Sequence, residues 1–146
     1  MKTSVLLIAL FITVFAYSQE LKENTDTKKF EYIEVVEQKR TVESFNSRLK
    51  SLGYKEIETS EYEVQGQGQI NEKVMGFVVE LFYDATIELK DEKYRIKITN
   101  VLVKDVKGTY ILEDMGGYKK KWLKKFNKRL PEIVSQLKKE NTPDKW

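Results

Sequence analysis

The sequence predicts an α+β domain in which an antiparallel sheet of about five strands is backed by two helices, in the order β-α-β-β-β-β-α. Between residues 62 and 98, apolar side chains recur at every second position, as they do along a strand with one buried face. In residues 41–53 and 118–138 they recur every three to four positions, which is typical of an amphipathic helix. Because the apolar faces of both kinds of element need cover, we expect the helices to pack on the sheet.

The chain begins with the pattern of a secretory signal peptide. Lys2 precedes an apolar run from Val5 to Phe15, and Ala16 and Ser18 are the small residues of a cleavage site before Gln19. The run is shorter than the roughly 20 residues that span a bilayer. We therefore expect an exported protein, periplasmic or extracellular, with no transmembrane segment after cleavage. An uncleaved membrane anchor is the alternative.

After the signal peptide of residues 1–18, the sequence divides into three further parts. Residues 19–28 are polar and lack periodicity, so we expect a flexible N-terminal segment. Residues 29–140 form a single domain, which is long enough to bury a substantial core. Residues 141–146 are expected to be a frayed tail.

Each element follows from a local pattern. Residues 30–37 are aromatic and β-branched and predict the first strand. The helix that follows has Thr41 as its N-cap and Gly53 as its C-terminal stop. Residues 62–70 and 77–89 alternate as strands, and the second is long enough that we expect a bend or bulge in it.

Asp91 and Glu92 predict a tight turn into the next strand. If the two strands of this hairpin paired one residue out of register, every side chain would turn to the other face of the sheet, so the register is a specific prediction. A further short strand is expected at 109–112. The expected apolar pairs are Leu89/Tyr94, Ile87/Ile96 and Ala85/Ile98, and the expected polar pairs are Glu88/Arg95 and Thr86/Lys97.

The closing helix is expected to begin near Tyr118. Its apolar face then points to the core, its lysines lie roughly opposite, and Pro131 predicts a kink because it removes a backbone hydrogen bond. The apolar face consists of Trp122, Phe126, Leu130, Ile133 and Leu137.

The segments "FEYIEVV", "GQG" and "IELKDEKYRIKITNV" and the basic closing helix together resemble a family of small, secreted, uncharacterised bacterial proteins, a domain of unknown function with a TBP-like fold. The resemblance runs from about Phe30 to Leu137, although the family more often has glycine where Glu92 stands. It implies a curved antiparallel sheet backed by two helices, and it brings no activity and no catalytic residues. TBP-like proteins elsewhere bind DNA, but a fold does not carry a function. Since an exported protein rarely meets DNA, we expect no nucleic-acid partner.

Composition excludes several kinds of enzyme. The chain has no histidine and no cysteine, which removes Ser-His and Cys-His nucleophiles and the commonest zinc ligands. No two of the 23 acidic residues are set in an apolar context that would separate their pKa values. We expect no catalytic residues, no metal and no cofactor. A hydrolase that uses Asp or Glu alone is the remaining alternative.

The stretch "EVQGQGQIN" is not a phosphate-binding loop, because Asn71 stands where a third glycine is needed and a strand follows instead of a helix. We expect Gly66 and Gly68 to leave a shallow trough on the inner face of the sheet. Trp122 or Phe126 is the expected side chain that fills it.

The outer face of the sheet is the leading candidate for binding a peptide, a glycan or an envelope protein. The other interpretation is an ordinary solvated face. On the first interpretation, the chain is an exported, non-enzymatic binding or interaction domain of the bacterial envelope. The residues expected on this face are Gln65, Gln67, Gln69, Phe82, Arg95 and Lys97.

The basic run "YKKKWLKKFNKR" supports an alternative function, a peripheral protein that docks on anionic lipid or another polyanion. Against this, the formal net charge is only +3, and charge runs on amphipathic helices are usually solvated faces. The lysines of this alternative are Lys120, Lys121, Lys124 and Lys128.

Overall fold

The computed structural model describes residues 19–141. The signal peptide predicted over 1–18 and the tail residues 142–146 lie outside the described residues. Within 19–141 the chain forms one antiparallel sheet of seven strands and two α-helices, so the predicted α+β class is confirmed and the strand count is higher than expected. The strands are β1 (Lys22–Glu23), β2 (Phe30–Val36), β3 (Lys55–Thr59), β4 (Glu63–Val74), β5 (Phe77–Leu89), β6 (Tyr94–Asp105) and β7 (Gly108–Ile111).

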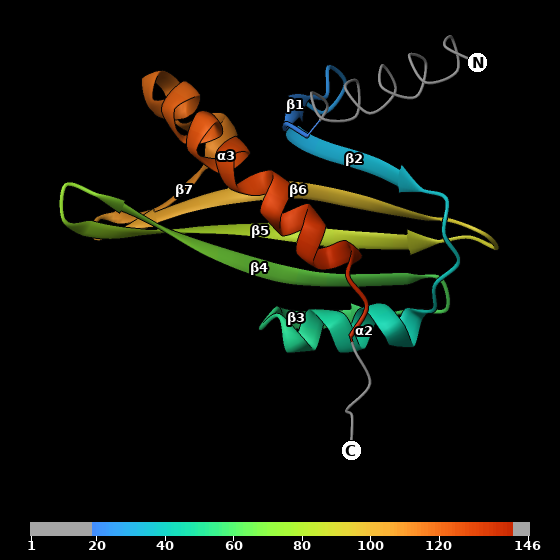
Figure 1. The fold of residues 1–146 in the computed structure, drawn as a ribbon. Helices are drawn as coiled ribbons and strands as arrows, with labels where there is room; N and C mark the ends of the chain where they lie inside the picture. The colour runs from blue at the N-terminus through green and yellow to red at the C-terminus, as the bar shows by residue number, and fades with distance from the viewer. Residues whose placement is uncertain (1–18, 142–146) are drawn as a thin grey trace, which may run out of the picture.

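The sheet has the order β1-β2-β6-β5-β4-β3, and β7 also pairs with β6. The helices are α2 (Val42–Ser51) and α3 (Lys119–Lys138), and two short 3-10 turns, Leu112–Asp114 and Gly116–Tyr118, precede α3. Figure 1 shows α3 lying diagonally across one face of the sheet, with α2 beside β3 at its edge.

The β5–β6 hairpin has the predicted register at all five pairs from Ala85/Ile98 to Leu89/Tyr94. A bulge was expected in residues 77–89, but the register shift between Phe82 and Asp84 places the extra residue on β6, because Thr99 to Leu102 faces the shorter step from Asp84 to Phe82. Within the bulge, Asn100 has a positive φ of 55°, a conformation that asparagine tolerates better than most residues. Its side-chain amide donates to Asp84 Oδ2 at 2.9 Å and fixes the bulge.

Two strands were not predicted, and both lack a periodic apolar signal. In β3 only Ile57 is apolar, and a register irregularity separates Lys55 from Glu58. β1 is two residues long and lies within residues 19–28, the segment expected to be flexible. Leu21 is buried beside it, and the Leu21 N–H donates to Asn127 Oδ1 of α3 at 2.8 Å. A contact across 106 residues cannot be read from local composition.

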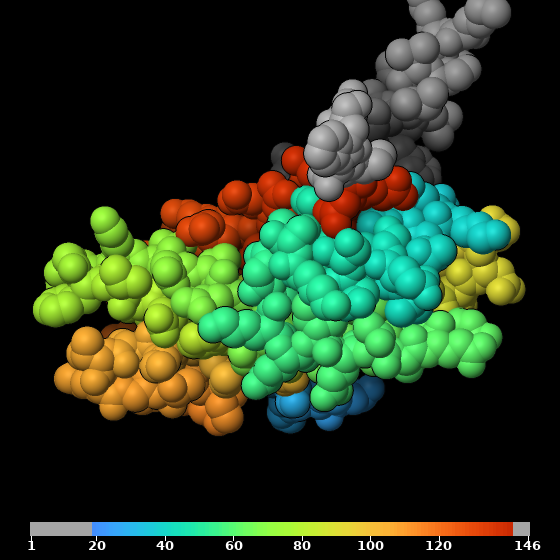
Figure 2. Space-filling model, turned by 90° about the horizontal axis from the view of Figure 1, so that it is seen from below, coloured from blue at the N-terminus to red at the C-terminus, as the bar shows by residue number. Residues whose placement is uncertain are grey.

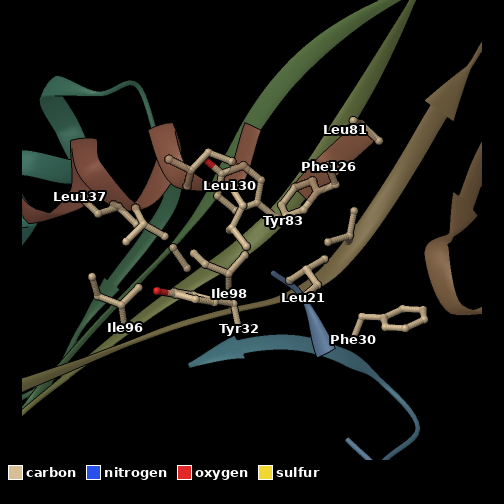
Figure 3. Packing of buried hydrophobic residues seen from close by; sticks show 14 of the residues in the cluster. Leu21, Phe30, Tyr32, Leu81, Tyr83, Ile96, Ile98, Phe126, Leu130 and Leu137 are labelled. Atoms are coloured by element: carbon tan, nitrogen blue, oxygen red, sulfur yellow. The ribbon is translucent and has the colours of Figure 1, made fainter. Parts of the chain in front are cut away.

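The core lies between α3 and the inner face of the sheet. The five residues predicted for the apolar face of α3 are all buried, and Figure 3 shows Phe126 and Leu130 facing Tyr83 of β5. The Tyr83 and Phe126 rings meet edge to face at a centroid distance of 5.6 Å. The helix continues across Pro131 to Lys138 as one element. No helix within residues 19–141 combines the length and the apolar content needed to cross a bilayer.

Two arginines hold the carboxyl end of α3, and we call them the arginine clamp. The last carbonyls of a helix have no partner inside it. Arg40 donates to the Lys138 carbonyl at 3.0 Å, and Arg48 donates to the Gln136 carbonyl at 2.8 Å. Since Arg40 precedes α2 and Arg48 lies within it, the clamp joins the two helices. Lys138 also pairs with Glu34 of β2 at 2.7 Å.

Candidate functional site

The outer face of the sheet carries the side chains that the alternation predicted. The register aligns Gln65, Thr86 and Lys97 in one row across β4, β5 and β6. A second row aligns Gln69 with Phe82 and continues to Leu102. The glutamines are half-buried or exposed, and Gln69 donates to Asn71 Oδ1 at 3.0 Å.

Both cations predicted for this face have an acidic partner. Arg95 Nη2 hydrogen-bonds to Glu88 Oε2, and Lys97 Nζ lies 3.6 Å from Glu31 Oε2. These pairs neutralise each other, so the face presents amides and a few apolar groups rather than a net charge. Its use as a binding surface stays a prediction.

The paired glycines do leave room for close neighbours, but the neighbours differ from those expected. A Cβ on Gly66 would lie 2.9 Å from Leu49 Cδ2 of α2, and one on Gly68 would lie 2.3 Å from Tyr83 Cζ. The trough is therefore filled by Leu49 and Tyr83 rather than by Trp122 or Phe126. Helix α2 covers Gly66, and Tyr83 stands directly opposite Gly68 in the register.

This packing borders a cleft of about 280 Å³ on the inner side of the sheet. We call it the tyrosine cleft. Tyr54 and Tyr83 lie in its wall, β4 contributes one side, and the loop after α2 and the carboxyl half of α3 contribute the others. The lining residues are Leu52, Gly53, Tyr54, Gly68, Gln69, Ile70, Tyr83, Arg129, Glu132, Ile133 and Gln136.

The two tyrosine hydroxyls share a hydrogen bond of 2.7 Å. One hydroxyl donates to the other, which leaves one O–H hydrogen of the pair for a further acceptor. Burial raises the pKa of Tyr83 to about 12, against smaller lowering effects of the Tyr54 hydrogen bond and the Arg129 charge. Burial, followed by the charge of Tyr83, also raises the pKa of Tyr54. Both side chains are therefore neutral at physiological pH.

The charged residues of the cleft lie at its rim and are largely paired. Arg129 Nη1 donates to Glu72 Oε1 at 3.1 Å and to the Asn71 carbonyl at 3.3 Å. Glu132 Oε2 lies 4.0 Å from Arg129 Nε. With its single arginine paired to carboxylates and its tyrosines neutral, the cleft suits an uncharged polar group that can accept a hydrogen bond.

Strand β4 has an open edge beside the tyrosine cleft. β3 pairs with β4 only as far as Gln67, and Figure 1 shows β4 continuing beyond β3. In an antiparallel ladder a residue directs its N–H and C=O to the same neighbour. The Glu63 carbonyl accepts a hydrogen bond from the Ser60 N–H before β4. Gln69, Asn71 and Lys73 lie an even number of residues further on, so they direct their backbone groups to the open edge. There the Asn71 carbonyl accepts from Arg129.

The lysines of the alternative function, at positions 120, 121, 124 and 128, are exposed on α3 as the pattern predicted. Trp122 and Phe126, which interleave them in the sequence, are buried beneath the helix. The basic run is therefore a solvated helix face whose aromatic residues belong to the core. Its role in docking stays a prediction.

Within the described part of the chain, the structure brings together no group of three acidic residues that could hold a metal ion. The tyrosine cleft contains carboxylates only at its rim, beside Arg129. The absence of catalysis stays a prediction from composition.

Comparison with solved structures bears on the fold. A TBP-like protein from Parabacteroides distasonis is similar at a TM-score of 0.58 and 16% identity, over 75% of this chain and 90% of that one. A DUF4468 family protein from Bacteroides ovatus is similar at a TM-score of 0.57 and 11% identity, over 85% and 94%. The fold is TBP-like. At these identities the TBP-like likeness shows architecture alone. No family model matches the sequence, and no curated protein matches it either.

Sequence reasoning did not find the tyrosine cleft, although one signal was present. If Met75 and Gly76 are taken as a hairpin turn, counting back from it places Gly68 opposite Tyr83, as the structure has it. A glycine opposite a large aromatic residue indicates close packing at that point. Tyr54 carried no such signal, because its hydroxyl meets Tyr83 only through the position of the segment before β3.

Proposed function

We propose that this chain is an exported, non-enzymatic binding domain of the bacterial envelope that holds an extended peptide along the open edge of β4. One side chain of the peptide enters the tyrosine cleft. An edge strand with unpaired backbone groups is a template for an added strand, and pockets beside it select side chains.

One observation carries this proposal: Gln69 belongs both to the open edge and to the lining of the cleft. A peptide that pairs with Gln69 and Lys73 would run beside the cleft without moving any strand, and between them it would meet the Arg129 side chain at the Asn71 carbonyl. Its backbone hydrogen bonds would supply affinity independent of sequence, and the cleft would supply the preference.

The chemistry of the cleft favours an uncharged polar side chain on the peptide. The Tyr54–Tyr83 pair offers one hydroxyl hydrogen to an acceptor, and Arg129 is held by Glu72 and by the Asn71 carbonyl. A side chain such as glutamine, asparagine, serine or threonine meets these requirements. A free carboxylate would compete with Glu72 and Glu132 for the single arginine.

The test uses Gln69→Pro, which removes the edge N–H of the residue that borders the tyrosine cleft. Because that N–H points away from β5, the substitution breaks no hydrogen bond of the sheet. The matched control is Gln69→Ala, which keeps the N–H and removes the side chain. Random peptides displayed on phage are selected on the chain from Gln19 onward, and the affinity of the selected peptides is measured by calorimetry.

We expect Gln69→Pro to weaken binding by about tenfold or more, since an unpaired peptide carbonyl costs about 1–3 kcal/mol. Gln69→Ala should bind within a few-fold of the parent protein. Equal binding by the proline variant would overturn the proposal. The proposal would also be overturned if only Gln65→Ala and Gln67→Ala lost peptide binding, because those side chains lie on the outer face.

A further inference from the structure

One end of the molecule presents large apolar side chains to solvent. The β4–β5 and β6–β7 turns lie together there, next to the start of α3 (Figures 1 and 2). Met75 is 94% exposed in the first turn and Val106 is 84% exposed in the second. We call this surface the apolar end. Its other exposed members are Phe77, Val78, Tyr110 and Tyr118.

A groove of about 570 Å³ lies between the two turns and α3, with Trp122 in its wall. The groove and the tyrosine cleft share no lining residue. An inference about the apolar end therefore stands apart from the proposed function. Exposed apolar clusters of this kind mark surfaces that meet a protein partner or a membrane.

The charge around the apolar end is positive. Lys73 and Lys107 are exposed beside the two turns, and Lys121 lines the groove. The Asp105 carboxylate also lines the groove, and it accepts the backbone N–H groups of Lys107 at 2.8 Å and Gly108 at 3.2 Å. Asp114 is the exposed acid in the groove wall. The three lysines therefore outnumber the two acids, Asp105 and Asp114.

We propose that the apolar end docks on the surface of an anionic lipid bilayer. Met75 and Val106 enter the boundary between headgroups and acyl chains, and the two hairpin turns carry them there without any change of fold. Tyr110 and Tyr118 have the amphipathic character of side chains at a membrane interface. The lysines keep their ammonium groups at the level of the lipid phosphates.

A lipid surface fits these observations better than a second copy of the chain. A two-fold dimer uses the same patch on both subunits, so it would bring Lys107 and Lys121 of one subunit close to those of the other. Like charges placed together across an interface oppose association. The two most exposed side chains also project from separate turns, which a deformable bilayer accommodates more easily than a rigid protein surface does.

This orientation differs from docking through the lysine face of α3. In the end-on orientation, Lys107 and Lys121 meet the lipid, whereas Lys124 and Lys128 lie one and two turns further along the helix. Trp122 also distinguishes the two orientations. It lines the groove at the apolar end, but it is buried beneath α3, away from the lysine face.

The test is co-sedimentation with vesicles of phosphatidylethanolamine and phosphatidylglycerol, compared with vesicles of phosphatidylcholine alone. The protein is the chain from Gln19 onward, which contains the described core and lacks the apolar run of residues 1–18. Three double variants are compared at low and high salt: Met75→Ser with Val106→Ser, Lys107→Gln with Lys121→Gln, and the charge-matched control Lys124→Gln with Lys128→Gln.

We expect the parent protein to bind the anionic vesicles, and salt to weaken the binding. The serine pair and the Lys107/Lys121 pair should each bind on the order of tenfold more weakly, since an apolar side chain and a surface lysine each contribute about a factor of five or more. The Lys124/Lys128 pair should bind like the parent. Failure of the parent to bind, or parent-like binding by the serine pair, overturns the proposal.

Fluorescence gives a second measurement that depends on orientation. With Trp146→Phe, Trp122 is the remaining one of the two tryptophans. Lipids with brominated acyl chains should quench its emission in the end-on orientation. Binding without quenching, together with a loss in the Lys124/Lys128 pair, would assign docking to the lysine face and overturn the end-on proposal. The peptide test at Gln69 is unaffected by either result.

Discussion

The two ends of α3 are supported in opposite ways. At the carboxyl end, the arginine clamp satisfies the last carbonyls, and the Arg40 side chain is fully buried. At the amino end, Tyr118 caps the helix without a side-chain hydrogen bond, and the first turn has no acidic residue. Lysines there oppose the helix dipole. The carboxyl end of α3 is therefore held by side-chain donors, whereas the amino end, which borders the surface called the apolar end, has no side-chain cap.

The contrast predicts its largest effect at Arg40. Arg40→Ala should lower the free energy of unfolding by about 3 kcal/mol, because it leaves buried carbonyls without a donor and opens a cavity beside Phe45. The guanidinium carbon lies 3.7 Å from the centre of that ring. The measurement is urea unfolding followed by circular dichroism. Arg40→Lys should recover part of the loss, since its ammonium group reaches fewer partners.

The matched control for Arg40 is Lys121→Ala at the other end of α3, where the side chain is exposed. It should change the free energy of unfolding by less than about 0.5 kcal/mol. If the two alanine variants lose similar stability, the two ends of α3 are not supported differently and the comparison is wrong.

The second prediction compares a glycine of the tyrosine cleft, Gly68, with a glycine just before α3, Gly117. Gly68→Ala should destabilise the fold by about 2 kcal/mol, because its Cβ would lie 2.3 Å from Tyr83 Cζ. Tyr83 is buried and hydrogen-bonded to Tyr54, so it cannot move aside freely. Gly117→Ala is the control near the apolar end, where a Cβ meets nothing within 4 Å. Thermal melting of the two variants compares them, and equal melting temperatures would contradict the packing described here.

How far the sequence predicted this structure depends on the range of each contact. The β5–β6 hairpin follows from residues a few positions apart, so its register was predicted pair by pair. The arginine clamp joins residues 88 and 98 positions apart, and nothing local marks Arg40 as buried. For the same reason the outward glutamines were predicted, whereas the tyrosine cleft was missed. Alternation reveals which face a side chain occupies, but a cleft depends on which distant element lies above it.

The smallest predicted effects come from removing one hydroxyl group beside the tyrosine cleft and from replacing one whole side chain at the apolar end. Tyr54→Phe should lower the free energy of unfolding by about 1 kcal/mol, since it removes the hydrogen bond to Tyr83, while Met75→Ser should lower it by less than about 0.5 kcal/mol.

The tyrosines also predict a pH dependence of stability. Burial raises the pKa of Tyr83 to about 12, and an unfolded tyrosine has a pKa of about 10. Its contribution to stability is complete below about pH 10 and is lost as the pH rises through about 12, because the unfolded chain releases the proton first. Tyr83→Phe should therefore reduce the fall in unfolding free energy across that range, and an identical fall in parent and variant would show that Tyr83 titrates as freely as an exposed tyrosine.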